Sequence, residues 1–554
     1  MTRLVVVPKA PLPADVEGGI ALSPDGRRLA YVANRDGQQQ AYLQELDQFE
    51  GKPFPGTEGA SNLAFSPDGR WLAFAAQRKI KKVAVTGGEP IEVSDIGEGR
   101  HGLSWESNDS ILFNAGQISG IWRVPAAGGT PSTVTTLGPG ELEHRYPEIL
   151  PGGKVLLYSA LMSTVTTDDL RVVVQSLETG QRRMIAAGAS AGYLPAGRLA
   201  YVRGGTVFAV PFDLARLEVT CAPTLALQGV RETSQATPQI AYSQAGSMTY
   251  VPASDHQSQD TLVWVDRSGK EQPTTVSGAA LRAPRLAPDL HRVAAIVRDD
   301  GRTGGADLWT HDLVRGTRDR LTFDGADTPL WAPDGSRLAY SARRNDVAEI
   351  HVKTLGGTTS DRRLATSPDT NFPFSWSPDG KFLAAVAVNV STGNDIWVYG
   401  VDDPSSSRAF IKTPFREGGP TFSHDGRWIA YASLKSGHSE IYMSPFPGPG
   451  EEWTISTEGG SEPVWARKSG RLFYRQGDAM MGLDITTAPT LAVGKPRRLF
   501  EGRYNRSPGF WPDYDVTPDG ERFLMVKGRG SEAPNRINVV LNWQEELTRV
   551  APTK

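Results

Sequence analysis

The chain has 554 residues, of which 39% are hydrophobic, so it can bury several times the core of a minimal domain. Its 59 Lys and Arg residues nearly balance its 62 Asp and Glu residues. The formal net charge of −3 gives no global electrostatic reason to bind nucleic acid or an anionic membrane surface. The single cysteine, Cys221, excludes an intramolecular disulfide framework and a cysteine-rich metal site.

The N-terminus contains an apolar run, Leu4 to Val7, that is too short for the hydrophobic region of a signal peptide. No stretch approaches the roughly 18 apolar residues of a membrane span. We therefore expect a soluble chain with neither a signal peptide nor a transmembrane segment in the sequence as given. The compartment stays open, because a periplasmic or other extracytoplasmic protein and a cytoplasmic protein can both lack disulfides.

A short turn sequence recurs along the chain. Pro presets φ at the first central position of this turn, and Asp and Gly tolerate the conformations that follow, so each copy predicts a hairpin between two strands. Neighbouring copies lie about 43–46 residues apart, which is typical of a four-stranded propeller blade. The copies are Ser23–Gly26, Ser66–Gly69, Ala332–Gly335, Ser377–Gly380 and Thr517–Gly520, with variants at Ala287–Leu290 and Ser423–Gly426.

Each turn is followed by an alternating run of β-branched and aromatic residues, as in Arg28–Val32 and Trp428–Tyr431, which predicts a second strand. A third strand begins with an acidic, an aliphatic and an aromatic residue, as in Asp307–Trp309 and Asp395–Trp397. A more polar fourth strand, such as Asp319–Phe323, fits an outer edge. With degenerate copies in the gaps, the count is about twelve blades, and a helix is expected only near Gln544–Val550.

These motifs carry a family resemblance. The pattern Ser-Pro-Asp-Gly-Arg-Arg-Leu-Ala-Tyr with Asp-Ile-Trp resembles the TolB-like (PD40, WD40-like) β-propeller repeats, which implies an all-β propeller array in a bacterial protein. The order of the blades also looks like the C-terminal sensor-like region of bacterial receptor-type serine/threonine kinases. That likeness implies a location outside the cytoplasmic membrane. No kinase Gly-rich loop, His-Arg-Asp loop or Asp-Phe-Gly motif is present, so no kinase activity is implied.

Closure of the array is predicted from the two ends of the chain. The last blade is expected to contain Tyr514–Val516, Phe523–Val526 and Asn538–Trp543, and an N-terminal strand within residues 3–8 is expected to complete it. Two six-bladed rings, blades 1–6 in residues 1–279 and blades 7–12 in residues 280–554, are slightly favoured. The alternative is one continuous ring of twelve blades over residues 1–554.

The loops that enter the innermost strands are expected to line the mouth of a central channel, where converging charges bind ligands. The alternative for each residue is a solvated position on a polar face. The candidate ligand-binding residues are Glu17, Arg145, Arg282, Asp327, Asn371, Arg416, Glu417 and Glu462.

The most specific group of candidate metal ligands consists of two imidazoles and a carboxylate. His101, Glu143 and His144 lie in neighbouring predicted blades, and such a set can hold a divalent ion such as zinc or manganese with positions open for chemistry. Their spacing matches no compact ligand motif, which favours a structural role. An acidic hairpin with Asp299, Asp300 and Asp307 is a weaker candidate for calcium, so no cofactor is assigned.

Catalytic motifs are weak. Gly188–Gly192 fits the Gly-x-Ser-x-Gly pattern of a nucleophile elbow, but no helix is predicted after it. Walker, dinucleotide-binding and His-Glu-x-x-His motifs are absent. We therefore favour a non-catalytic, sensor-like recognition scaffold that binds a protein, peptide or glycan at the funnel. The alternative is a metal-dependent hydrolase or lyase with its site at the channel mouth.

Overall fold

The structure, a computed structural model, describes most of the chain in segments: residues 2–13, 16–35, 38–96, 101–116, 119–139, 141–162, 170–195, 197–233, 237–253, 260–298, 306–344, 347–356, 361–364, 370–389, 393–448, 450–505, 511–528 and 534–550. The chain divides into two compact units. Unit 1 comprises residues 1–257 and 532–554, and unit 2 comprises residues 258–531.

Unit 1 contains six antiparallel sheets within its described residues, each ordered from an inner first strand to an outer edge. The first three sheets are β2 (Ile20–Leu22), β3 (Arg28–Arg35), β4 (Gln38–Glu45) and β5 (Lys52–Pro53); β6 (Ser61–Phe65), β7 (Trp71–Ala76), β8 (Lys79–Ala84) and β9 (Ile91–Asp95); and β10 (Leu103–Trp105), β11 (Ser110–Asn114), β12 (Ile121–Pro125) and β13 (Ser132–Thr133).

The other three sheets of unit 1 include the one that holds both ends of the chain. They are β14 (Glu143–Ile149), β15 (Val155–Leu161), β16 (Leu170–Ser176) and β17 (Arg182–Ala187); β18 (Ala189–Leu194), β19 (Arg198–Arg203), β20 (Thr206–Asp213), β21 (Glu218–Val219) and β22 (Thr224–Gln228); and β23 (Ile240–Tyr242), β24 (Met248–Tyr250), β49 (Ile537–Leu541) and β1 (Thr2–Val6). Helix α1 (Trp543–Val550) follows β49.

Unit 2 repeats this plan, and its long strand β26 is shared by two sheets. The two sheets joined by β26 are β47 (Tyr514–Val516), β48 (Arg522–Lys527), β25 (Asp260–Asp266) and the first half of β26 (Glu271–Leu286), and then the second half of β26 with β27 (Arg292–Arg298), β28 (Asp307–Asp312) and β29 (Arg318–Arg320).

Each of the remaining four sheets of unit 2 is formed by one further copy of the repeat. They are β30 (Asp327–Trp331), β31 (Arg337–Arg344), β32 (Val347–Thr354) and β33 (Arg362–Arg363); β34 (Thr370–Trp376), β35 (Phe382–Asn389), β36 (Gly393–Gly400) and β37 (Arg408–Ile411), with a short 3-10 helix (Pro404–Ser406); β38 (Glu417–Phe422), β39 (Trp428–Ser433), β40 (Glu440–Pro445) and β41 (Trp453–Thr454); and β42 (Ser461–Trp465), β43 (Arg471–Gln476), β44 (Ala479–Thr486), β45 (Ala492–Val493) and β46 (Arg497–Glu501).

The recurrent turn joins the first and second strands, as the sequence predicts. In the copy at Ser377, the hydroxyl donates to Asp379 Oδ1 at 2.6 Å and accepts the backbone N–H of Phe382 at 2.9 Å. The Gly380 N–H donates to the Ser377 carbonyl at 2.9 Å, and Gly380 has a φ of 72° that a Cβ would strain. Ser and Asp therefore fix the turn through side-chain hydrogen bonds, and Gly provides the positive φ that the turn needs.

The sheets of each unit are arranged around a centre. In unit 1 the inner strands contact one another in the order β2, β6, β10, β14, β18 and β23, and β23 contacts β2 again. In unit 2 the corresponding closed order is β26, β30, β34, β38, β42 and β47. Buried apolar residues lie between successive sheets, as in the cluster that joins Ala30 and Val32 to Leu72 and Phe74. This radial packing confirms the predicted all-β propeller architecture.

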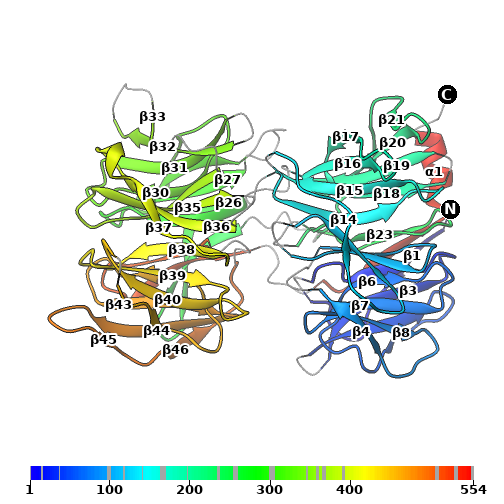
Figure 1. The fold of residues 1–554 in the computed structure, drawn as a ribbon, viewed down its shortest axis with the longest axis horizontal. Coiled ribbons are helices and arrows are strands. Elements are labelled where there is room, and N and C mark those ends of the chain that lie inside the picture. The colour runs from blue at the N-terminus through cyan, green and yellow to red at the C-terminus, as the bar shows by residue number, and fades with distance from the viewer. Residues whose placement is uncertain are drawn as a thin grey trace. The chain divides into compact units, whose positions relative to one another are not determined.

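The N-terminal strand pairs where the sequence predicts. β1 pairs with β49 from Thr2↔Leu541 to Val6↔Ile537, and Figure 1 shows β1 and α1 in the unit that contains β14 and β23. The expected composition of the last blade is wrong, however. β49 pairs with β24 in unit 1, whereas β47 and β48 join β25 in unit 2. An alternating strand shows which face is buried but does not identify its neighbour.

A β-bulge recurs near the start of the inner strands. Asn62, Tyr146, Thr328 and Glu462 have φ values of 50°, 52°, 46° and 55°, and strand pairing is interrupted beside each of them. Non-glycine residues seldom adopt a positive φ, so its repetition at one structural position marks a requirement of the fold. The bulge turns polar side chains and backbone N–H groups of one inner strand toward the neighbouring sheets.

Unit 2 interrupts unit 1 in the sequence, between β24 and β49. Its own ends are paired, because β25 runs antiparallel to β48 from Thr261↔Lys527 to Asp266↔Arg522. The boundaries of the compact units therefore differ from those of the ranges 1–279 and 280–554, which were based on the sequence repeats. The second range would leave out β25 and include β49, whose paired neighbours belong to unit 1.

We predict that residues 258–531 fold when expressed alone, since every strand of the closing sheet is then present. The expected result is a strand-dominated circular dichroism spectrum with one cooperative thermal transition. Residues 280–554 are the matched comparison, and they should aggregate or be cut rapidly by protease because β48 loses its partner. Equal folding of both fragments would contradict the pairing seen in the structure.

Candidate functional site

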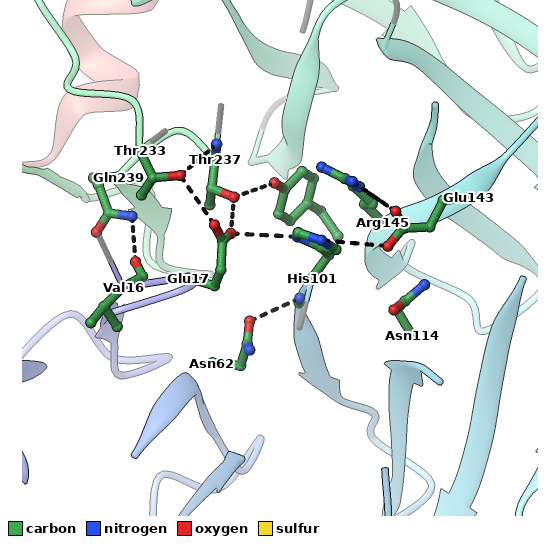
Figure 2. A network of polar contacts seen from close by, with 12 residues as sticks. Val16, Glu17, Asn62, His101, Asn114, Glu143, Arg145, Thr233, Thr237 and Gln239 are labelled. Carbon is green, nitrogen blue, oxygen red and sulfur yellow. Dashed lines mark hydrogen bonds and ion pairs between the residues drawn. The ribbon is translucent and has the colours of Figure 1, made fainter. Parts of the chain in front are cut away.

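Three predicted site residues meet at the centre of unit 1. Glu17 precedes β2, His101 precedes β10 and Glu143 begins β14, so three inner strands supply them. His101 Nδ1 lies 3.4 Å from Glu17 Oε2, and its Nε2 lies 3.6 Å from Glu143 Oε1. Figure 2 shows the imidazole between the two carboxylates. All three side chains are buried, so this group is internal to the ring.

The Glu17 carboxylate is held from the other side by the segment before β23. The Thr233 hydroxyl donates to Glu17 Oε1 at 3.1 Å, and the Thr237 hydroxyl donates to Oε2. The Tyr146 hydroxyl lies 2.8 Å from Thr237 Oγ1. Burial, with the nearby Glu17 charge adding to it, raises the pKa of Tyr146 well above its usual range, so this phenol stays neutral.

Arg145 completes the network. Its Nε and Nη2 both donate to Glu143 Oε2, at 3.0 and 2.7 Å. Burial is the largest single influence and lowers the pKa of Arg145, but Glu143, Tyr146 and Glu17 together outweigh it and raise that pKa. The structure thus brings together Glu17, His101, Glu143 and Arg145 in one buried network of two carboxyl groups, a guanidinium and an imidazole.

His144 does not join this group. Its Nδ1 lies 2.7 Å from Thr135 Oγ1, its Nε2 lies 2.9 Å from Glu141 Oε2, and its ring packs on Tyr158. Both ring nitrogens therefore have partners other than the His101 group. No group of three His, Cys, Asp or Glu side chains converges as a metal centre among the residues that the structure describes. The metal-centre hypothesis stays a prediction, and in the part of the chain that the structure describes His144 binds Thr135 and Glu141.

Unit 2 brings Arg282 and Asp327 together at its own centre. Arg282 Nε, on β26, lies 3.6 Å from Asp327 Oδ1 on β30. Asp513, which the sequence analysis missed, accepts the Ala283 N–H at 2.8 Å. Burial raises the pKa of Asp513 to about 6, although the Ala283 N–H and the Arg282 charge oppose this rise.

The other four candidates of unit 2 are Asn371, Arg416, Glu417 and Glu462. Asn371 Oδ1 accepts the Tyr399 hydroxyl at 2.6 Å, and Glu462 Oε2 accepts the Asp513 N–H at 3.3 Å. Glu417 is buried against β39, whereas Arg416 is partly exposed. Most of the candidates are thus built into the inner ring and do not form a solvated rim.

The centre of unit 2 also contains an aromatic cluster that the sequence analysis missed. Trp511, just before β47, packs on Phe372 and Phe374 of β34, with ring centroids 5.2 and 5.6 Å apart. In the closed order of inner strands, β34 and β47 lie on opposite sides of the ring. The cluster therefore spans the centre of unit 2.

The site residues that the sequence analysis missed share a position in the repeat, at the bulge or shortly before an inner strand. Tyr146 occupies a bulge position, and Asn62, at another, accepts the Gly102 N–H on its Oδ1 at 2.9 Å. Thr237, Trp511 and Asp513 all lie shortly before an inner strand. Aligning the repeats on their turns and examining the residues that precede each inner strand would have identified these positions.

Two weaker candidates have structural roles. Ser190, in the Gly-x-Ser-x-Gly segment, has a φ of 47° because it occupies the recurrent bulge of β18, not a strand-to-helix turn. Asp307 accepts the Thr322 hydroxyl and the Gly325 N–H at 3.0 and 3.1 Å, which locks the third strand of its sheet. Asp299 and Asp300 lie outside the described residues.

Comparison with known proteins decides the kind of repeat. Residues 326–525 match the family described as the TolB beta propeller domain (PD40). Residues 326–525 are thus a TolB-like β-propeller region. The predicted TolB-like resemblance is confirmed, whereas the likeness to the sensor-like region of receptor kinases stays a prediction.

The similarity covers only parts of these relatives. The Tol-Pal system protein TolB of Bordetella pertussis is 30% identical over 121 residues, which are 22% of this chain and 27% of that protein. An uncharacterized peptidase, YuxL, of Bacillus subtilis is 29% identical over 170 residues, 28% of this chain and 23% of that protein. The chain thus spans about a quarter of the length of each of these two relatives.

Among solved structures, a putative TolB from Agrobacterium tumefaciens aligns with 49% of this chain and 99% of its own, at 18% identity and a TM-score of 0.41. Within the described part of this TolB-like chain, no helix is both long and apolar enough to cross a membrane.

We predict that Glu143→Gln destabilises unit 1 by about 3 kcal/mol, because it leaves the buried Arg145 cation without its carboxylate. Urea unfolding measures the change. Glu178→Gln is the matched control, since the Lys154–Glu178 pair is 68% and 61% exposed and such pairs contribute little. Equal effects of the two substitutions would show that the central network does not stabilise the ring.

We predict that Asp513→Asn flattens the pH dependence of unit 2 stability. The pKa of Asp513 is raised to about 6, so its favourable contribution is complete below about pH 4 and is lost as the pH rises through 6. The variant should be more stable than wild type by up to about 3 kcal/mol at pH 7 and equal to it near pH 4. Unfolding curves at several pH values measure this difference, and parallel pH profiles would contradict it.

Proposed function

We propose that this TolB-like chain is a non-catalytic scaffold that binds a protein partner, and that the partner docks on the loop face of unit 2. The loop face is the one that carries the connections from outer strands into inner strands. Two observations support this proposal. The repeat is of the TolB-like kind, and most charged candidate residues are buried, so we infer that they stabilise the ring and do not bind a ligand. Each unit is, in this proposal, a closed six-bladed propeller.

Exposed aromatic residues on the loop face carry the proposal. Phe323, on the connection into β30, is 69% exposed, and Phe415, on the connection into β38, is 45% exposed. The Arg320 guanidinium lies 4.9 Å from the centroid of the Phe323 ring. Aromatic and arginine side chains are enriched where proteins bind one another, because they bury large areas at a small entropic cost.

Arginine side chains belong to these connections or pair with the strands that follow them. Arg416 adjoins Phe415 in the sequence and is partly exposed. Arg282 is 20% exposed and pairs with Asp327, at the start of β30. A surface that combines apolar rings with nearby cations favours a polypeptide ligand with apolar and acidic side chains. A neutral glycan is the less favoured ligand, since its ring faces need an open aromatic platform.

The test is site-specific photo-crosslinking in cells of the source organism, with a benzophenone amino acid at position 323 or 415. We expect a discrete crosslinked protein from both positions. Position 49 is the matched control, because Phe49 is fully exposed on a turn of unit 1.

Once that partner is purified, the double variant Phe323→Ala, Phe415→Ala should weaken its binding at least about tenfold by calorimetry. Phe49→Ala should leave the affinity unchanged. Crosslinking only from position 49, or an unchanged affinity in the double variant, would contradict docking on the loop face of unit 2.

A further inference from the structure

A pocket with several basic lining residues lies in unit 2, between the sheet of β42–β46 and the turn that follows β25. Strand β44 pairs with β43 on one side and with β46 on the other (Figure 1). The pocket has a volume of about 90 Å³. One water molecule needs about 10–15 Å³ of such space, so the pocket has room for a group of several heavy atoms. Its basic lining residues are Arg267, Arg471, Lys495 and Arg497.

Two of these cations are held in place by acidic residues. Glu521 pairs with Arg471 and, at 3.6 Å, with Arg267. The Arg471 Nε donates to Asp484 Oδ1 at 3.2 Å. Asp484 itself lines the pocket, and its charge is offset by this pair. The two guanidinium groups are therefore fixed beside the pocket, and their positive charge is balanced by Glu521 and Asp484.

The other two cations have no such partners. Within the part of the chain that the structure describes, Lys495 and Arg497 form no ion pair, and their side chains donate no hydrogen bond. Both side chains are exposed and line the same small pocket. An anion bound there would be attracted by both cations at once.

The inner wall of the pocket is apolar. Phe473 is 1% exposed, Leu483 is 5% exposed, and Leu499 is half-buried. Gly482 lies on this wall, and a Cβ added to it would be only 3.0 Å from Phe473 Cδ1 and from Leu499 Cδ1. The absence of a side chain at Gly482 thus keeps the wall open. An apolar group could pack on this wall while an anionic group attached to it lies among the cations.

The matching sheet of unit 1 is a control within the same chain. β20 pairs with β19 and β22 in the way that β44 pairs with β43 and β46. Ala209 of β20 is paired with Thr224 of β22, at the place where Gly482 is paired with Arg497. An uncharged residue therefore takes the place of Arg497 in unit 1.

The connections before β22 and β46 can be compared in the same way. The first residue of each donates its N–H to a carbonyl of the third strand, Thr220 to Pro211 at 3.1 Å and Gly494 to Asp484 at 2.9 Å. Residues 220–223 carry no charge, whereas residues 494–496 include Lys495. Because unit 1 forms this sheet without either cation, the fold does not require them.

We propose that this pocket binds a small phosphate monoester, with the phosphate among the four cations and the organic part on the apolar wall. A phosphate monoester carries about 1.5–2 negative charges near pH 7, which match the two cations that lack ion pairs. Arginine suits such a group because its guanidinium can donate two parallel hydrogen bonds to phosphate oxygens. The small volume favours a small molecule over a segment of polypeptide.

NMR titration of the full chain with phenyl phosphate, observed on the ligand, tests the proposal. The ionic strength is kept fixed, because salt screens exposed charges. Phenyl phosphate should bind at least about tenfold more tightly than benzoate, which has the same ring but a single charge. It should also bind more tightly than inorganic phosphate, which cannot contact the apolar wall. Equal affinity for benzoate, or tighter binding of inorganic phosphate, would overturn the proposal.

The decisive variant is Lys495→Ala, Arg497→Thr, because it gives both places the uncharged character of unit 1. It should fold like wild type, since both side chains are exposed, and should bind phenyl phosphate at least about tenfold more weakly. Arg498→Ala is the matched control. Arg498 is the next residue of β46, so it points to the other face, and it pairs with Glu501 at 3.3 Å. Its removal should change the affinity by less than about twofold.

No binding of phenyl phosphate to wild type, an unchanged affinity in the double variant, or an equal loss in Arg498→Ala would overturn the proposal. These results are distinct from partner docking. Arg471 begins a second strand, whereas Phe323 and Phe415 precede first strands, so the pocket and the loop face lie at opposite ends of the strands. The variant Phe323→Ala, Phe415→Ala should therefore bind phenyl phosphate like wild type.

Discussion

The structure depends on one constraint: a circle of sheets must have no unpaired strand where its first and last sheets meet. In unit 1 the closing sheet takes two strands from the middle of the sequence, one from the C-terminal region and one from the N-terminus. In unit 2 the pairing of β25 with β48 closes the ring in the same way. Both closures use strands far apart in the sequence, so the loss of either partner opens a ring and exposes an edge.

The recurrent bulge follows from this circular packing. Inner strands converge toward the centre, and a residue with positive φ lets the backbone N–H of one strand reach its neighbour, as Tyr146 N–H reaches the His101 carbonyl at 3.1 Å. The same bend turns polar side chains inward. Charged groups at the centre must then be paired, and in unit 1 Glu143 and Arg145 achieve this, with His101 and Glu17 beside them.

The sequence predicts the local structure well, because each local element has a chemical cause. The Ser-Pro-Asp-Gly turn is fixed by its own hydrogen bonds, and the alternation of Arg28–Val32 specifies a strand with one buried face. The grouping of Tyr514–Val516 with Asn538–Trp543 was wrong, since hydrophobic alternation carries no record of the partner strand. The convergence of Glu17, His101 and Glu143 was expected, but their burial was not, because loop composition does not show how far a bulge turns a side chain inward.

A repeat protein offers a further kind of inference that a single domain does not, since each copy tests the others. A polar residue that is buried in one copy and replaced by alanine in another is not required by the fold, so its cost must be offset by something specific to that copy. Glu417, which takes the place of Ala326, meets this condition, whereas Asp307 does not, because Glu440 takes its place in another sheet and accepts the Gly459 N–H at 2.9 Å. Comparing the copies therefore separates acidic residues that hold the sheets together in several copies from those that are buried in one copy alone.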